Sequence, residues 1–270
     1  MARRSRTALI LALSLAGCGR LGFATARDAD ADPDADSMDG PATAAHDEDG
    51  DGIDDAVDPC PHIFSDASDA DQDGVGDLCD PNPQSGTEKW IGFYPMTAGT
   101  NPLVGEPGFP FAQEGDDVRY TRDLNESFDM AVPPAVSLRI EVGFEIVSLV
   151  GTGQHVISSG ITTSGAEYYF VELDNNGGAS AARIVQYDTT NGYVTLSSMP
   201  IADYHTGLGH LRYDAVVGSS PHYTAELGWD GELYTPNSAT PAYTPTTDLR
   251  IVLGGMDVRV RYIAIIQSGT

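Results

Sequence analysis

The stretch SLRIEVGFEI, residues 137–146, decides the fold, because apolar residues occupy every second position along it. The apolar members, which share one face of an extended strand, are Leu138, Ile140, Val142, Phe144 and Ile146. Similar alternation recurs in residues 211–217 and 223–229. Strands with one apolar face predict a sheet packed on a core on that side.

Turn signals divide residues 89–270 into many such strands. Asn191-Gly192 separates residues 184–187 from 193–196, and Asp230-Gly231 follows residues 223–229. Both dipeptides favour two-residue hairpin turns. Residues 258–266 become apolar on both faces towards their end, as expected of a central strand covered on two sides. No long stretch has a helical period with caps, so roughly ten to thirteen strands predict an all-β sandwich.

Acidic residues are concentrated in one part of the chain. The 270 residues include 14 Lys+Arg and 40 Asp+Glu, a formal net charge of −26. Residues 28–80 contain 19 of the acids and no Lys or Arg, whereas residues 81–270 contain 21 acids and 9 bases. A polyanion thus precedes a mildly acidic globule. Nucleic acids and anionic lipid headgroups are excluded as partners, because both require a basic surface.

The N-terminus is typical of an export signal. Three arginines precede a short apolar run, residues 7–15, well below the roughly 20 residues that span a bilayer. The run ends in LAGC, residues 15–18, which resembles the lipobox of bacterial lipoproteins. The resemblance implies removal of residues 1–17, lipid attachment at Cys18 and, because Gly19 follows, an outer-membrane or cell-surface location in a Gram-negative cell. An ordinary signal peptide with an incidental cysteine is the alternative.

Residues 18–46 continue with Asp-Ala alternation, Pro and Gly. This composition cannot build a core, and its like charges repel one another. It predicts a lipid-anchored, extended, disordered tether.

Two twelve-residue segments, 47–58 and 69–80, repeat one pattern 22 residues apart. Each has Asp at positions 1, 3, 5, 9 and 12, Gly at position 6 and an apolar residue at position 7. Calcium takes six to eight oxygen ligands in flexible geometry, and Gly permits the sharp bend between them. The predicted ligands, with the position-7 residue acting through its carbonyl, are Asp47, Asp49, Asp51, Ile53, Asp55, Asp58, Asp69, Asp71, Asp73, Val75, Asp77 and Asp80.

Other interpretations of this acidic run fit less well. A disordered linker does not require Gly and an apolar residue at fixed positions twice. EF-hand and dockerin loops require flanking helices, which Pro59-Cys60-Pro61 forbids. Because a bound dication offsets the repulsion among the carboxylates, we expect residues 47–80 to order only with metal, while the following sandwich folds without it.

The acidic run resembles the thrombospondin type 3 repeat over residues 47–80. The matching residues are Asp47, Asp49, Asp51, Gly52, Asp55, Asp58, Cys60 and Pro61, then Asp66, Asp69, Asp71, Asp73, Gly74, Gly76, Asp77, Cys79 and Asp80. The resemblance implies a helix-free stalk wound around Ca²⁺ ions and a Cys60–Cys79 disulfide, which suits an exported protein.

Residues 88–270 resemble a laminin-G-like or concanavalin-like jelly roll. The resemblance is carried by KWIGFY at 89–94, the strand–Asp-Gly–strand hairpin at 225–234 and the final strands at 249–255 and 260–265. It implies a β-sandwich domain that binds carbohydrate or a surface protein.

Signals for catalysis are weak. No Gly-x-Ser-x-Gly motif occurs, and the six histidines are scattered. Glu172 and Asp174 share a strand face, as the carboxylates of some glucanases with this fold do, but no third acid follows. We therefore expect them to be solvated on an edge strand. A buried carboxylate pair in a concave cleft would favour a hydrolase, and a shallow aromatic groove would favour binding.

The sequence therefore predicts a calcium-binding, lipid-anchored cell-surface protein with a lectin-like binding or adhesion domain and no enzymatic activity. A polysaccharide-active hydrolase of the envelope and a structural surface spacer are the alternatives.

Overall fold

The computed structural model describes residues 46–65, 67–99, 101–103, 111–123, 125–132, 137–151, 153–163, 167–175, 180–188, 191–201, 205–216, 222–237 and 248–268. The chain divides into two compact units, residues 1–43 and 44–270, and all described residues belong to the second. The expected signal peptide, Cys18 and almost all of the tether lie outside the described residues.

Fourteen strands are found in the described part of the chain, and they form two antiparallel sheets. Sheet A contains β1 (Lys89–Pro95), β2 (Phe111–Glu114), β3 (Asp117–Arg122), β5 (Ser137–Leu149), β10 (Gly207–Val216), β11 (His222–Trp229), β12 (Glu232–Tyr234) and β14 (Met256–Ser268). Sheet B contains β4 (Glu126–Ala131), β6 (Val156–Thr163), β7 (Glu167–Asp174), β8 (Ala181–Asp188), β9 (Gly192–Pro200) and β13 (Asp248–Gly254).

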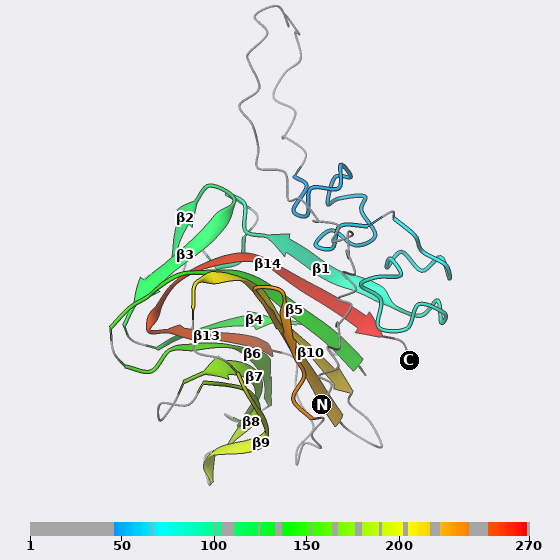
Figure 1. The fold of residues 1–270 in the computed structure, drawn as a ribbon. Helices are drawn as coiled ribbons and strands as arrows, with labels where there is room; N and C mark the ends of the chain where they lie inside the picture. The colour runs from blue at the N-terminus through cyan, green and yellow to red at the C-terminus, as the bar shows by residue number, and fades with distance from the viewer. Residues whose placement is uncertain are drawn as a thin grey trace, which may run out of the picture. The chain divides into compact units, whose positions relative to one another are not determined.

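The strand order confirms the predicted all-β jelly-roll sandwich. Sheet A runs β12-β11-β10-β5-β14-β3-β2, with β1 on the same edge of β14 as β3, and sheet B runs β4-β13-β6-β7-β8-β9. The chain passes repeatedly between the sheets, for example from β4 to β5 to β6 and from β12 to β13 to β14. Such crossings between two antiparallel sheets are the mark of a jelly roll. Figure 1 shows the two layers.

The core lies between the sheets and follows from the alternation in the sequence. All five apolar residues of the 137–146 stretch are at most 3% exposed. Large aromatic side chains fill the centre of the core. The ring of Tyr223 lies 4.9 Å from that of Tyr169 and 5.1 Å from that of Tyr213. Tyr169 is fully buried, so its role is core packing.

The two predicted hairpins are confirmed, and β11 pairs with β12 across the expected two-residue turn Asp230-Gly231. The other hairpin does not turn at Asn191-Gly192 as expected, because Gly192 begins β9 and pairs with Asp188 of β8. The backbone φ angles of Asp230 and Gly231 are 49° and 83°, as a turn with two left-handed residues requires.

β14 is covered on both faces, as its late apolar run predicted. Ile263 and Ile265 point into the core, whereas Ile266 packs against Cys60, Val75 and Cys79 from the acidic run. We call residues 46–88 the acidic segment; its loops lie beside β1 and β14 (Figure 1). The segment therefore lies on the sandwich rather than apart from it. Its described residues form no helix, and in the described part of the chain no helix is long and apolar enough to cross a membrane.

Candidate functional site

The two predicted loops share a backbone shape. Gly52 and Gly74, at position 6, have φ angles of 93° and 92°, a region that side-chain-bearing residues rarely adopt. In each loop the position-1 carboxylate closes the bend. Asp47 accepts hydrogen bonds from the amides of Gly50 and Gly52 at 2.8 and 2.9 Å, and Asp69 makes the corresponding pair at 2.8 and 3.0 Å. The predicted role of the position-6 glycine is confirmed.

The bends bring carboxylates together in two clusters. In the first, oxygens of Asp47, Asp49 and Asp51 lie within 4.8 Å of one another. In the second, oxygens of Asp71, Asp73, Asp80 and Glu88 do so. Positions 3 and 5 belong to a cluster in both loops.

Two positions in each loop carry a buried oxygen that no described group contacts by a hydrogen bond. These oxygens belong to positions 3 and 12: Oδ2 of Asp49, Oδ2 of Asp58, Oδ1 of Asp71 and Oδ2 of Asp80. In each of these side chains the other oxygen accepts a backbone amide, which fixes its orientation. Buried polar oxygens are normally bonded, so these four oxygens are the groups of the two loops that suit a cation.

The electrostatics of the clusters agree with this. Burial, reinforced by neighbouring carboxylates, raises the pKa of Asp49 and of Asp80 to about 6, despite hydrogen bonds from backbone amides. The pKa values of Asp58 and Asp71 are raised for the same reasons. A dication would offset this repulsion, and a set of carboxylate oxygens suits Ca²⁺.

Other predicted ligands have different contacts. Asp55 and Asp77, at position 9, use both oxygens within the chain: Asp55 contacts the amide of Glu48 and the ring of His46, and Asp77 contacts the amide of Ala70 and the hydroxyl of Ser68. At position 7, Val75 is fully buried and Ile53 is partly buried.

Glu88 is a cluster member that the sequence analysis missed. It is 4% exposed, and its backbone amide donates to Asp73 at 2.7 Å. Glu88 follows Asp66 by 22 residues, the spacing of the two loops, so the repeat itself was a signal for it. Asp66 lies outside the described residues. Because Glu88 directly precedes β1, the second cluster is joined to the sandwich.

The predicted disulfide is confirmed: Cys60 and Cys79 are bonded, with their Cα atoms 5.7 Å apart. It lies where the acidic segment contacts sheet A. Trp90 Nε1 donates to the carbonyl of Pro59 at 3.2 Å, and Arg139 donates to the carbonyl of Cys79 at 3.1 Å.

His62 anchors the segment on the outer face of sheet A. Its ring lies 5.1 Å from that of Tyr262, and its Nε2 is 3.7 Å from Oε2 of Glu141. The hydroxyl of Tyr262 donates a hydrogen bond to Oε1 of Glu141 at 2.7 Å, and Nη1 of Arg212 lies 3.9 Å from Oε2 of Glu141. Burial alone would raise the pKa of Glu141, but the hydrogen bond and charge of His62, with help from His210 and Tyr262, lower it to about 2.

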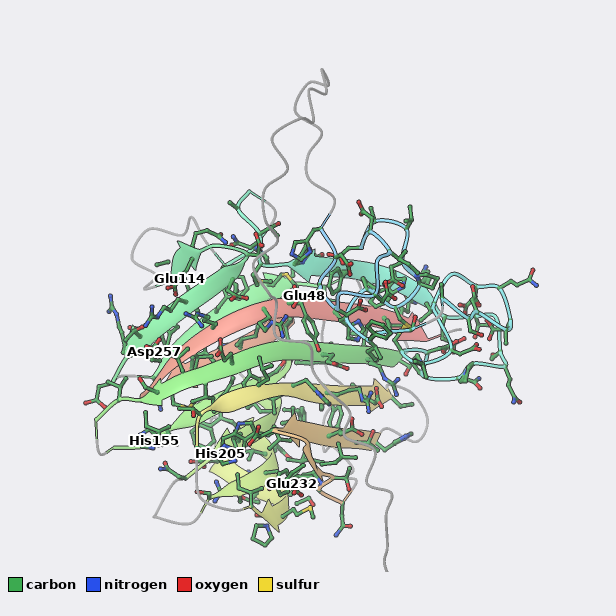
Figure 2. All side chains as sticks on the ribbon, turned by 45° about the horizontal axis from the view of Figure 1, so that its top comes forward. Glu48, Glu114, His155, His205, Glu232 and Asp257 are labelled. Atoms are coloured by element: carbon green, nitrogen blue, oxygen red, sulfur yellow. A yellow bond between two sulfur atoms is a disulfide. The ribbon has the colours of Figure 1, made fainter. Side chains whose placement is uncertain are left out.

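Glycine makes room for this contact. A Cβ at Gly143 would lie 2.2 Å from the ring of Tyr262, so a residue with a side chain here would displace that ring. Elsewhere on sheet A the charges pair with one another. Figure 2 shows Glu114 and Asp257 near the end where β2, β3 and β14 meet, and both bond Arg119. Figure 2 also shows Glu48 near β14, where it pairs with Arg261 at 2.8 Å.

A cleft of about 440 Å³ lies on the outer face of sheet B. Strand register explains its composition. Ser158, Glu172 and Arg183 are cross-strand neighbours on one row, and Phe170 and Val185 are neighbours on the next. The remaining lining residues are Asn125, Gln154, Val156, Asp174, Tyr193, Thr195 and Val252. The cleft therefore has a polar half and an apolar, aromatic half.

The polar half contains the carboxylate pair that the sequence placed on a solvated edge strand. That expectation was wrong, because β7 lies between β6 and β8, and the side chains of Glu172 and Asp174 are only 12% and 4% exposed. Arg183 bonds Asp174 and lies 3.9 Å from Glu172. Burial, followed by the charge of Asp174, raises the pKa of Glu172 to about 7, although Arg183 opposes the shift.

No family model matches the chain, and no curated protein does. Its fold is similar to the CBM2 module of the evolved Dit of Lactobacillus casei BL23 phage J-1, at 10% identity and a TM-score of 0.48, covering 68% of this chain and 97% of that one. The carbohydrate recognition domain of Emp47p is similar at 13% identity and a TM-score of 0.46, covering 69% of this chain and 99% of that one. A legume lectin-like domain from Entamoeba histolytica is similar at 11% identity and a TM-score of 0.42, covering 72% of this chain and 95% of that one. These likenesses are distant.

Proposed function

We propose that this chain is an exported, lipid-anchored surface protein that binds calcium through its acidic segment and carbohydrate through the cleft on sheet B. The observation that carries the binding function is the cleft itself, in which polar groups converge beside apolar and aromatic ones. Sites for small ligands commonly combine an apolar wall with a few fixed polar groups in a volume of about 300–1,000 Å³.

The residues of the cleft suit a sugar. Hydroxyl groups both donate and accept hydrogen bonds, and Gln154, Ser158 and Arg183 offer donors beside the acceptors of Glu172 and Asp174. Phe170 provides an apolar wall, and the side chain of Tyr193 is 73% exposed at the rim. An aromatic ring of this kind can stack on the apolar face of a sugar.

The test of carbohydrate binding is a glycan array with the wild-type protein and Tyr193→Ala. Phe64→Ala is the matched control, because Phe64 is 69% exposed but lies on the acidic segment. We expect a glycan signal that falls at least tenfold in Tyr193→Ala and is unchanged in Phe64→Ala. Absence of any glycan signal, or equal signals from both variants, would contradict the proposal.

For calcium, the residues present fit the ion. Asp71, Asp73, Asp80 and Glu88 would hold one ion, and Asp47, Asp49 and Asp51, with the buried oxygen of Asp58, would hold another. A bound Ca²⁺ would supply positive charge that lets the clustered carboxylates stay ionised.

Calorimetric titration of calcium into the chelator-treated full chain tests this assignment. We expect uptake in the wild type and loss of one class of sites in the double variant Asp71→Asn/Asp80→Asn. Asp116→Asn, in the turn between β2 and β3, is the control and should bind as the wild type does. No uptake at millimolar calcium would remove calcium from the proposal.

A hydrolase is the second candidate, because the carboxylate pair is buried in the cleft. Glycosidases use two carboxyl groups, one of which keeps a raised pKa and acts as an acid. Glu172 has that property, whereas the ion pair of Asp174 with Arg183 favours binding. Release of reducing ends from an array-positive polysaccharide, abolished by Glu172→Gln, would establish hydrolysis in place of simple binding.

The lipid anchor rests on residues 15–18 of the sequence. Cys18→Ser should move the full-length protein from the detergent phase to the aqueous phase on phase partitioning. Equal partitioning of wild type and variant would contradict lipid attachment at Cys18.

A further inference from the structure

The cleft on sheet B contains an unequal set of charges. Among its described lining residues, Glu172 and Asp174 are the acids, Arg183 is the base, and Tyr193 is the remaining titratable group. Arg183 bonds Asp174 and lies 3.9 Å from Glu172, so a single guanidinium serves both carboxylates. With both acids ionised, one negative charge is in excess in a largely buried place. Such a charge is costly unless a further cation or proton is supplied.

The neighbouring wall of the cleft also favours a cation. Phe170 and Tyr193 line it, and aromatic faces attract ammonium groups electrostatically. Phe170 precedes Glu172 by two residues on the same strand, so both side chains lie on the same face of β7. A positively charged group entering beside Glu172 would therefore meet the carboxylate and the aromatic wall together.

We infer that the sugar taken by this cleft bears a protonated primary amine, as a de-N-acetylated amino sugar does, and that Glu172 receives the ammonium group. This inference rests on the proposed carbohydrate site and adds the chemical class of its ligand. Burial, followed by the charge of Asp174, raises the pKa of Glu172, and a proton on Glu172 relieves the same excess negative charge that an ammonium group would. Binding of the ammonium group should therefore release a proton from Glu172 at and below neutral pH.

The experiment compares two matched disaccharides, glucosamine β-1,4-glucosamine and its N,N′-diacetyl form, by calorimetric titration of the full chain in calcium and 150 mM salt. Disaccharides are used because a long polycation would bind the acidic segment nonspecifically. We expect the amine form to bind at least tenfold more tightly than the acetylated form at pH 7. Repeating the titration in buffers of different ionisation enthalpy should reveal the released proton.

The Glu172→Gln variant keeps the shape of the side chain and removes its charge. It should lose the preference for the amine and the proton release, so that the two sugars bind the variant with similar affinities. Glu114→Gln, on the far sheet, should behave as the wild type. Equal affinities for the two sugars in the wild type, or an amine preference that survives Glu172→Gln, would overturn the inference and leave the carbohydrate site standing. Failure of both sugars and of the glycan array would overturn the site itself.

Discussion

Gly76 lies where the disulfide closes the acidic segment. A Cβ at this position would be 2.6 Å from Sγ of Cys60 and 3.1 Å from Cβ of Pro59. We predict that Gly76→Ala destabilises the protein by about 1–3 kcal/mol, the usual cost of overpacking a tight site. Gly153→Ala is the control, because its nearest neighbour would be 3.8 Å away. Urea unfolding monitored alongside a free-thiol assay measures the effect, and equal stability of the two variants would show that the site can relax.

Glu141 gives the contact between the acidic segment and sheet A a pH dependence. Its pKa is about 2 in the folded protein, against about 4.3 in an unfolded chain. Because the folded pKa is lowered, the stabilising contribution is complete above about pH 5 and is lost as the pH falls towards 2. We predict that Glu141→Gln is less stable than wild type at pH 6 and that the difference shrinks towards pH 2.

The measurement is the urea midpoint at half-unit steps from pH 2 to pH 6, with Glu232→Gln, an exposed residue on β12, as the control. A single group changes the free energy of unfolding by at most about 1.4 kcal/mol per pH unit. Parallel curves for wild type and Glu141→Gln would mean that His62 and Tyr262 do not stabilise the ionised carboxylate.

At the scale of elements, we expect the stability of the calcium-free acidic segment to decrease as the pH rises. This direction is opposite to that of the Glu141 contact. The pKa of Asp49 and Asp80 is raised to about 6 in the folded loops, so their stabilising contribution is complete below about pH 4 and is lost as the pH rises through 6. We predict that, in chelator, hydrogen-exchange protection of residues 47–80, corrected for the intrinsic exchange rate, is greater at pH 4.5 than at pH 7.5. Calcium should restore protection at pH 7.5. Protection in chelator that does not change with pH would contradict the raised pKa values.

Local patterns were sufficient to predict elements, and contacts between distant segments were not. The alternation in residues 137–146 and the Asp-Gly turn at 230–231 act within one strand or hairpin, so the sequence predicted them. The place of β7 within sheet B depends on which strands pair beside it, and the sequence alone gives no such order. For that reason Glu172 and Asp174 were recognised as sharing a face but were assigned to an exposed edge.

The same limit explains what the candidate site added. The loop spacing predicted that Asp71, Asp73 and Asp80 are neighbours, because all three belong to the same twelve-residue loop. Glu88 joins them across a loop, and His62 meets Glu141 across 79 positions of sequence. Neither contact has a local signature. Only the 22-residue interval between Asp66 and Glu88 carried a hint of the first.

At the scale of the whole molecule, calcium should stabilise the sandwich as well as the segment. The sequence alone predicted that the sandwich folds without metal. The structure changes that expectation, because Glu88 adjoins β1, Trp90 bonds Pro59, and Ile266 of β14 packs on the disulfide. Loss of calcium from the second cluster would therefore weaken the contacts that the acidic segment makes with β1 and β14.

We therefore predict a single thermal transition that moves down when calcium is removed. An ion present at about 100 times its dissociation constant adds about 2.7 kcal/mol, and each kcal/mol shifts the Tm of a domain of this size by about 2–4 °C. Loss of each of the two proposed ions should lower the Tm of the wild type by roughly 5–10 °C. Asp71→Asn/Asp80→Asn should respond less, because it retains only the first cluster. A sandwich transition that stays in place while residues 47–80 lose their hydrogen-exchange protection would show that the segment unfolds on its own and that the contacts through β1 and β14 do not couple the two.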